Sequence, residues 1–328
     1  MKKILFRADA SVDIGYGHFI RSLALADMLK ENFDCCFVTV NPTEYQIQEI
    51  KKVCRYISLS ESNHFNVFLS LLRGDEIVVL DNYFFATDYQ REIKKRGCKL
   101  VCIDDIHDKH YVADVVINHG VDNPKLFSIE PYTRLCLGIE WVLLRKPFIE
   151  APMKNRSKEY SSNTANIAIS FGGVDQYRLT DKVIAMLHAK RNIERIDAIV
   201  GKEYQENTNY SSLSNVFFHR SVSAQEVADI FFYCDLAILS TSSICIEALV
   251  CRTFIAAGYY VDNQVYLYNY LVQNKLIRGL GCLLELEFSN INNIQKSKFD
   301  FSIIGKIANI ASRYVECFKL LYYENSYI

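Results

Sequence analysis

Residues 3–29 read KILFRADASVDIGYGHFIRSLALADML, and this stretch decides the fold. The run Lys3–Ala8 is short and mostly apolar, which is typical of a strand buried within a parallel sheet. A loop with two glycines follows Asp9, and a helical repeat runs from His18 to Leu29. One face of that helix carries the apolar residues Ile20, Leu23, Ala24 and Met28. A strand that leads through a loop into an amphipathic helix is the unit of parallel sheets covered by helices.

The same alternation of apolar runs and helical repeats continues along the chain. In the second half the apolar runs are NIAIS, RIDAIV, NVFFHR, DLAILS and TFIAAG, and Ser223 with Glu226 forms the signature of a helix capping box. In the first half, further strands are expected at Cys35–Val40, Glu76–Asp81, Leu100–Asp104 and Asp114–Asn118. The pattern predicts an α/β protein with parallel sheets.

Length and one polar segment divide the chain into two domains. A chain of 328 residues is long for a single domain, and residues 152–163 are polar and without periodicity. We predict an N-terminal α/β domain over residues 1–150 and a C-terminal α/β domain over residues 151–328, which ends in a helix from Ile303 to about Tyr322. The expected fold is two doubly wound parallel-sheet domains facing a central cleft.

Composition argues against several kinds of partner. The net charge is -1 and no long basic stretch is present, so nothing in the sequence indicates nucleic acid binding. No apolar run is long enough to span a bilayer, and the N-terminal MKKILFRAD is a strand sequence rather than a signal peptide. The eleven cysteines lie within apolar runs without a CxxC pair, as expected of core residues in a reducing compartment. We therefore expect a cytoplasmic protein without an integral membrane segment.

The loop after the first strand is a candidate site, because ligands of open α/β sheets bind outside the carboxyl ends of strands. Gly15 and Gly17, on either side of Tyr16, let the backbone approach a ligand, and the first amides of the helix suit an anion. His18 stands at the positive end of the helix dipole, which favours a neutral imidazole that can accept a proton. Asp9 is a second candidate. The alternative is a glycine turn beside a surface histidine.

Two segments of the second domain have the features of a phosphate site. In ISFGGVD a strand runs into Gly172 and Gly173, and in LAILSTSSICIEAL a strand delivers Ser240–Ser243 to the start of a helix. Glu247 lies one turn into that helix, where a carboxylate can accept hydrogen bonds from both hydroxyls of a ribose. The alternatives are an ordinary glycine turn, serine N-caps, and Glu247 on a solvated face. The ISFGGVD segment is not a Walker motif, because no GKS or GKT follows it, and the glycine loop of the first domain is not a proper GxGxxG motif.

Polar residues also end two strands of the first domain. VVLDNYF places Asp81, Asn82 and Tyr83 at one strand end, and VCIDDIHD places Asp104 and Asp105 at another. Such carboxylates serve as bases or metal ligands, but they also cap helices, and we interpret the Asp104–Asp105 pair as caps. No cluster has metal-ligand spacing, and we predict neither a metal nor another cofactor.

In this order and spacing, one family shares the segments LFRAD, IGYGHFIRSLALA, LDNY, CIDD, LGIEWVLLRKPF, SFGGVD, SSICIEAL and DNQ. They resemble the UDP-2,4-diacetamido-2,4,6-trideoxy-β-L-altropyranose hydrolases of pseudaminic acid synthesis, within the glycosyltransferase-B superfamily. The likeness runs from Lys3 to about Gln264, and the GxGH segment with LLRKPF is fairly specific. Asn82, where family members often have His, and the longer tail beyond about Gly281 are departures.

The resemblance implies a glycosyltransferase-B-like fold with UDP on the second domain. It identifies His18 as the catalytic base and Tyr83 as an active-site tyrosine, with the family's GxG loop at Gly15–Gly17. It also implies that Glu247 binds the ribose. The remaining matches are a phosphate loop at Ser242 and Ser243 and a sugar-facing segment at Asn263 and Gln264.

The implied reaction is hydrolysis of the anomeric C–O bond of a UDP-sugar with inversion, in which His18 removes a proton from the attacking water. The products are UDP and the free sugar. Two other functions stay open at this stage. A transferase would use the same residues to pass the sugar from UDP to an acceptor hydroxyl, and a non-catalytic module would bind the nucleotide sugar without cleaving it.

Overall fold

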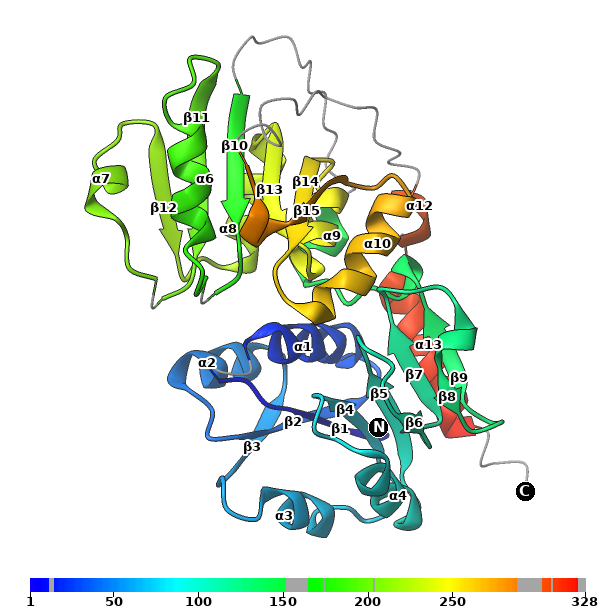
Figure 1. Ribbon diagram of the computed structural model, residues 1–328. Helices are drawn as coiled ribbons and strands as arrows, with labels where there is room; N and C mark the ends of the chain where they lie inside the picture. The colour runs from blue at the N-terminus through cyan, green and yellow to red at the C-terminus, as the bar shows by residue number, and fades with distance from the viewer. Residues whose placement is uncertain are drawn as a thin grey trace. The chain divides into compact units, whose positions relative to one another are not determined.

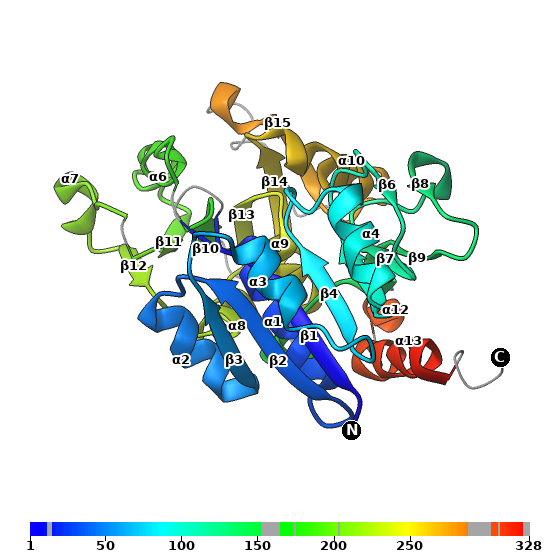
Figure 2. The same cartoon turned by 90° about the horizontal axis from the view of Figure 1, so that it is seen from below.

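The chain is described by a computed structural model, which covers residues 1–11, 15–151, 165–173, 175–202, 204–287, 303–307 and 309–323. It divides into two compact units. Unit 1 comprises Met1–Arg145 and Ile307–Ile328, and unit 2 comprises Lys146–Lys306. Each unit is a parallel sheet covered by helices, as Figures 1 and 2 show.

Unit 1 contains a seven-stranded sheet in the order β3-β2-β1-β4-β5-β7-β9, with every neighbouring pair parallel. The strands are β1 (Lys3–Ala8), β2 (Asp34–Val40), β3 (Arg55–Leu59), β4 (Ile77–Asp81), β5 (Lys99–Ile103), β7 (Val115–Asn118) and β9 (Arg134–Leu137). A separate two-stranded ladder joins β6 (His110–Tyr111) and β8 (Ser128–Ile129).

Helices cover both faces of the unit 1 sheet (Figure 1). One face carries α1 (Gly17–Leu29) and α2 (Glu44–Val53), and the other carries α3 (His64–Ser70) and α4 (Thr87–Lys95). The C-terminal helix α13 (Ile310–Tyr323) packs against α1. The central strands are consequently buried on both sides, which is why their sequences are nearly continuous apolar runs rather than alternating ones.

Unit 2 has a six-stranded parallel sheet in the order β12-β11-β10-β13-β14-β15. Its strands are β10 (Ala165–Ser170), β11 (Ile193–Val200), β12 (Val216–Arg220), β13 (Leu236–Ser240), β14 (Phe254–Tyr259) and β15 (Arg278–Cys282). Its helices are α5 (Lys146–Glu150), α6 (Leu179–Leu187), α7 (Thr208–Ser211), α8 (Ala224–Tyr233), α9 (Ser243–Val250), α10 (Val265–Gln273) and α12 (Ile303–Ile307).

The order of the strands in each sheet determines where the candidate loops lie. In unit 1 the order reverses between β1 and β4, and in unit 2 it reverses between β10 and β13. The crevice outside the carboxyl ends at such a switch point is where doubly wound sheets bind ligands. His18 follows β1, Asp81 ends β4, Gly172 follows β10 and Ser242 follows β13. The loops selected from the sequence therefore lie at the two switch points.

The predicted α/β fold is confirmed, and the expected strands are found with small shifts at their ends. The capping box of Ser223 and Glu226 is present at the start of α8. Five strands were missed. Two of them, β6 and β8, are only two residues long. The other three, in the large sheets, are β3, β9 and β15. Of these three, β3 and β9 are only partly buried, and β15 contains two glycines, so none of them shows a strong apolar run. The predicted linker at residues 152–163 lies outside the described residues.

The terminal helix requires a correction. Instead of one helix from Ile303 to about Tyr322, the structure has α12 and α13, with Asn309 between them in the left-handed region at φ 63°. Helix α13 belongs to unit 1 rather than to the C-terminal domain, and the division of the units falls at Arg145 rather than near residue 150. Buried aromatic side chains hold α13 there: Tyr314 packs edge-to-face on Trp141 with its hydroxyl donating to the Trp141 carbonyl, and Phe318 contacts Phe33.

All eleven cysteines are free, and all but Cys54 and Cys282 are buried, which confirms the core interpretation. Within the described ranges, no helix has both the length and the apolar character that crossing a membrane requires.

Phe318 provides a test of the α13 packing. It is fully buried, so Phe318→Ala should lower the free energy of unfolding of unit 1 by about 3–5 kcal/mol. Trp141, the sole tryptophan, lies beside α13 and reports unfolding of this unit by fluorescence in urea. Leu320→Ala on the same helix, where the side chain is 50% exposed, is the control and should cost less than about 0.5 kcal/mol. Equal effects of the two substitutions would contradict this packing.

Candidate functional site

The switch point of unit 1 holds the base predicted from the sequence. Gly15 has φ 80°, and its amide donates to the Ser11 carbonyl at 2.8 Å, which turns the chain ahead of α1. His18 then lies in the first turn of that helix and is only 6% exposed, so the alternative of a surface histidine is wrong. Its Nδ1 is 2.7 Å from Oδ1 of Asp81, the last residue of β4.

The contact between His18 and Asp81 fixes the tautomer of the imidazole. Burial opposes ionisation of Asp81, but Arg21 and His18 hold its pKa below the ordinary value, so the carboxylate is an acceptor only. Nδ1 of His18 also lies 3.1 Å from Nη2 of Arg21, but that nitrogen donates to Oδ1 of Asp81 at the shorter distance of 2.6 Å. Nδ1 therefore carries the hydrogen toward Asp81, and Nε2 is the nitrogen that can take a proton. The carboxylate also stabilises the positive charge that His18 gains when it does so. The helix dipole, on which the prediction from the sequence rested, disfavours that positive charge.

Arg21 links this pair to a second carboxylate. Its Nε and Nη2 donate to Asp81 at 2.7 and 2.6 Å, and its Nη1 donates to Asp105 at 2.5 Å. Burial again opposes ionisation, yet Arg21 keeps the pKa of Asp105 well below its usual range. The Tyr83 hydroxyl donates to the other oxygen of Asp105 at 3.0 Å, and its ring packs edge-to-face on His18 with centroids 4.7 Å apart.

His119, directly after β7, is a buried histidine that the sequence analysis did not select. It is 4% exposed, and among the described residues its Nδ1 has no hydrogen-bond partner. Burial lowers its pKa to about 4, against an opposing effect of Asp105. His119 is therefore a neutral imidazole beside a charged cluster at neutral pH.

Asp9 and Asp104 have structural contacts instead. Oδ1 of Asp9 accepts from the Val40 amide at 2.8 Å and from the buried Arg7 guanidinium, and its backbone pairs with the side chain of Asn82. These bonds tie the ends of β1, β2 and β4 together, and a part for Asp9 in substrate binding stays a prediction.

Asp104 accepts from the amides of its own turn and from Tyr111 and Asn118, as a capping residue does. The capping interpretation therefore fits Asp104. It does not fit Asp105, which joins the charged cluster through Arg21.

The predicted GxG loop lies in front of open space. A Cβ added at Gly15 or Gly17 would meet nothing within 4 Å, so the backbone there is accessible to a ligand. Tyr16 is the N-terminal cap of α1, and its ring lies 6.3 Å from that of Tyr45. Residues 12–14 of this loop lie outside the described part of the chain.

In unit 2, Gly172 and Gly173 follow β10, with Gly172 at φ 90°. The Tyr260 hydroxyl donates to the Phe171 carbonyl at 3.0 Å and would be 3.3 Å from a Cβ at Gly172. Gln264 accepts from the Tyr260 amide at 3.0 Å, and Asn263 lies beside it in the short helix η4 (Asp262–Gln264). The predicted glycine loop and the predicted sugar-facing segment are thus joined through one tyrosine.

The start of α9 differs from the start of α6. At α6, Asp175 accepts from the amides of Leu179 and Thr180, so those donors are already used. At α9, Ser242 is the N-cap residue and makes no side-chain capping bond, which leaves amide donors suited to an anion. Glu247 is 3% exposed, so the alternative of a solvated face is wrong for this residue.

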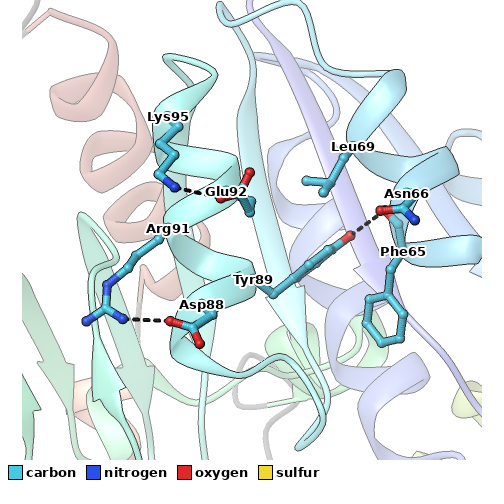
Figure 3. A pocket seen from close by; sticks show the side chains of 8 residues that line it. All are labelled: Phe65, Asn66, Leu69, Asp88, Tyr89, Arg91, Glu92 and Lys95. Atoms are coloured by element: carbon cyan, nitrogen blue, oxygen red, sulfur yellow. Dashed lines mark hydrogen bonds and ion pairs between the residues drawn. The ribbon is translucent and has the colours of Figure 1, made fainter.

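A surface groove of about 390 Å³ lies between α3 and α4 (Figure 3). Its charged residues pair with each other, Arg91 with Asp88 and Lys95 with Glu92. It contains none of the predicted site residues, and we assign it no part in the site. Within the described ranges, no three His, Cys, Asp or Glu side chains are grouped as metal ligands.

Comparisons with known proteins give two relatives and a fold, while no family model matches the chain. UDP-2,4-diacetamido-2,4,6-trideoxy-beta-L-altropyranose hydrolase of Campylobacter jejuni is 26% identical over 268 residues, covering 80% of this chain and 93% of that enzyme. An uncharacterized protein of Methanocaldococcus jannaschii is 27% identical over 94% of this chain, which spans 66% of that protein's length.

Among solved structures, the calicheamicin glycosyltransferase CalG4 matches with a TM-score of 0.66 over 98% of each chain, at 9% identity. The chain has the glycosyltransferase-B fold. The family resemblance recognised in the sequence is confirmed by the Campylobacter relative. Within this glycosyltransferase-B fold, the residues brought together in unit 1 are His18 and Tyr83, both predicted, with Arg21, Asp81 and Asp105.

His119 makes the stability of unit 1 depend on pH. In the unfolded chain a histidine titrates near 6.5, but in the folded unit its pKa is about 4. As pH falls through this window the unfolded state takes up a proton that the folded state refuses, so stability is lost. From pH 7 to pH 5 we expect a loss of roughly 2 kcal/mol by urea unfolding, followed by Trp141 fluorescence.

His119→Gln should remove most of this pH dependence, because glutamine does not titrate. His110→Gln, at a half-exposed histidine of the same unit, is the control and should retain it. A loss of stability between pH 7 and pH 5 that is the same in both variants would show that other groups cause it.

Proposed function

We propose that the chain is a UDP-sugar hydrolase that cleaves the anomeric C–O bond of a UDP-2,4-diacetamido-2,4,6-trideoxyhexose with inversion. Its products would be UDP and the free sugar, for nonulosonic (pseudaminic) acid synthesis. One observation carries the proposal: a buried histidine hydrogen-bonded to a carboxylate at the switch point of unit 1. The likeness to the Campylobacter hydrolase supports the substrate class.

In this mechanism unit 1 supplies the base and unit 2 binds UDP. Nε2 of His18 takes a proton from water while the water oxygen forms a bond to the anomeric carbon. The anomeric C–O bond breaks, and UDP leaves with the electron pair. Attack opposite to UDP inverts the configuration. Hydroxyls and amides at Ser242 and Ser243 neutralise the leaving diphosphate, so no acid is required to protonate it.

A sugar transferase is the second candidate, and exposed aromatic residues favour it. Tyr45 is 45% exposed and contacts Tyr16, and Phe84 is 40% exposed beside Tyr83. Apolar surface near the catalytic loop is what a transferase with a membrane-bound acceptor would use for docking. The products separate the two: a hydrolase releases free sugar from UDP-sugar without any acceptor, whereas a transferase leaves most of the donor intact. A binding module would leave all of it intact over hours.

Glu247 tests the UDP site. If its buried carboxylate accepts hydrogen bonds from the ribose, Glu247→Ala should weaken UDP binding by roughly tenfold or more, since bonds to a charged group contribute about 1.5–3 kcal/mol. Calorimetry with UDP measures the affinity, and Glu194→Ala, at an exposed position on β11, serves as the control. Unchanged affinity in folded Glu247→Ala would remove this residue from the ribose site.

His18 tests the reaction. With UDP-2,4-diacetamido-2,4,6-trideoxyhexose as substrate and EDTA present, wild-type protein should release UDP and free sugar, as followed by mass spectrometry. His18→Ala and His18→Asn should lose on the order of 10²–10⁴-fold in kcat while UDP affinity is retained, because UDP binds the other unit. Near-normal hydrolysis by folded His18→Ala would defeat the mechanism. Loss of wild-type turnover in EDTA with recovery in Mg²⁺ would overturn its metal independence.

A further inference from the structure

Five side chains of unit 1, with the proposed base His18 among them, form a closed ring of contacts. His18 bonds to Asp81, Asp81 to Arg21, Arg21 to Asp105, and Asp105 to the Tyr83 hydroxyl. The ring closes where the aromatic rings of Tyr83 and His18 pack edge-to-face, with an interplanar angle of 82°. Three separate chain segments contribute: the start of α1, the end of β4 with the residues after it, and the turn after β5.

We propose that Asp81, Arg21 and Asp105 are positioning residues, which hold His18 with its hydrogen on Nδ1 and hold Tyr83 against its ring. The catalytic role of His18 rests on the proposed function, and that of Tyr83 rests on the family resemblance. The tautomer of His18 depends on neither. None of the three positioning residues needs to touch the substrate. They act through His18, whose Nε2 they keep as the proton acceptor, and through Tyr83, whose hydroxyl they orient.

The charges of the cluster explain why Arg21 has to lie between the carboxylates. Two carboxylates this close would repel each other, and one would be driven to take up a proton. The guanidinium bridges them with hydrogen bonds to both, and the pKa of each is lowered despite burial. Asp81 therefore stays ionised and accepts from Nδ1. The charges of Asp81, Asp105 and Arg21 sum to one net negative charge, which a proton taken by His18 cancels.

Unit 2 contains a matched control. Asp197 on β11 accepts from Arg195 at 2.8 Å and from Nε2 of His219 at 2.6 Å, so it is also a buried aspartate bound to one arginine and one histidine. It lies within the strand rather than at the switch point, and it belongs to none of the proposed catalytic or binding residues. Asp197→Asn disturbs an equivalent ion cluster without touching the ring around His18.

The first experiment measures the tautomer directly. In wild-type protein, ¹⁵N NMR of the histidine side chains, with the His18 signals identified by their loss in His18→Gln, should show the imidazole of His18 with its hydrogen on Nδ1. In Asp81→Asn the Nε2-protonated form should become populated, whereas Asp197→Asn should leave the His18 signals unchanged. A wild-type His18 protonated on Nε2 would overturn the proposal. The wild-type measurement needs neither substrate nor a folded Asp81 variant.

The second experiment measures turnover. Asp81→Asn should lower kcat on the order of 100-fold or more with little change in KM. The reason is that His18 no longer keeps its hydrogen on Nδ1, whereas substrate binding is unaffected. Asp197→Asn should keep kcat. If folded Asp81→Asn turns over like wild type, Asp81 has no positioning part. If wild type shows the Nδ1 tautomer but cleaves no UDP-sugar, the proposed function fails and the positioning of His18 stands.

Discussion

The buried carboxylate of Asp81 is the group on which the site of unit 1 depends. An ionised side chain with no exposure to solvent costs several kcal/mol unless hydrogen-bond donors surround it. Its donors, His18, Arg21 and Ser22, all come from the first two turns of α1 at spacings of three and four residues. Satisfying that one charge therefore fixes how α1 lies on β4, and with it the orientation of the proposed base.

The two units use the same topology for different chemistry. At the switch point of unit 1 the strand ends carry charged side chains that pair with each other, which suits the transfer of a proton. At the switch point of unit 2 the strand ends carry glycines and small hydroxyl residues, and the start of α9 is without a side-chain cap. That arrangement suits an anion that brings its own charge. The proposal that unit 1 supplies the base and unit 2 binds UDP follows from this contrast, and not from the fold that the two units share.

The sequence predicted the sheets and the two loops because these depend on local signals: apolar runs, glycines and strand order. It did not predict the cluster around His18, because its members are far apart in the chain. The periodicity of α1 places its apolar face at Ile20, Leu23, Ala24 and Met28 and does not indicate that Arg21 and Ser22 are buried. Both are buried because Asp81 lies opposite them, and no residue near them in the sequence indicates that contact. For the same reason the sequence places α13 in the wrong unit. Its apolar face indicates that the helix packs against another element, but not which element.

The setting of His18 also bears on which nucleophile it would serve as the proposed base. A base and a leaving-group site are common to hydrolases and transferases, so they do not separate the two. The space available beside the proposed base is what bears on this distinction. His18 is 6% exposed, its Nδ1 is taken by Asp81, and the Tyr83 ring packs on its face. A small nucleophile such as water reaches the remaining nitrogen with less rearrangement than a sugar or lipid-linked hydroxyl would require. The burial of the imidazole is therefore an argument for hydrolysis that is independent of any relative, and it opposes the exposed aromatic residues that favour transfer.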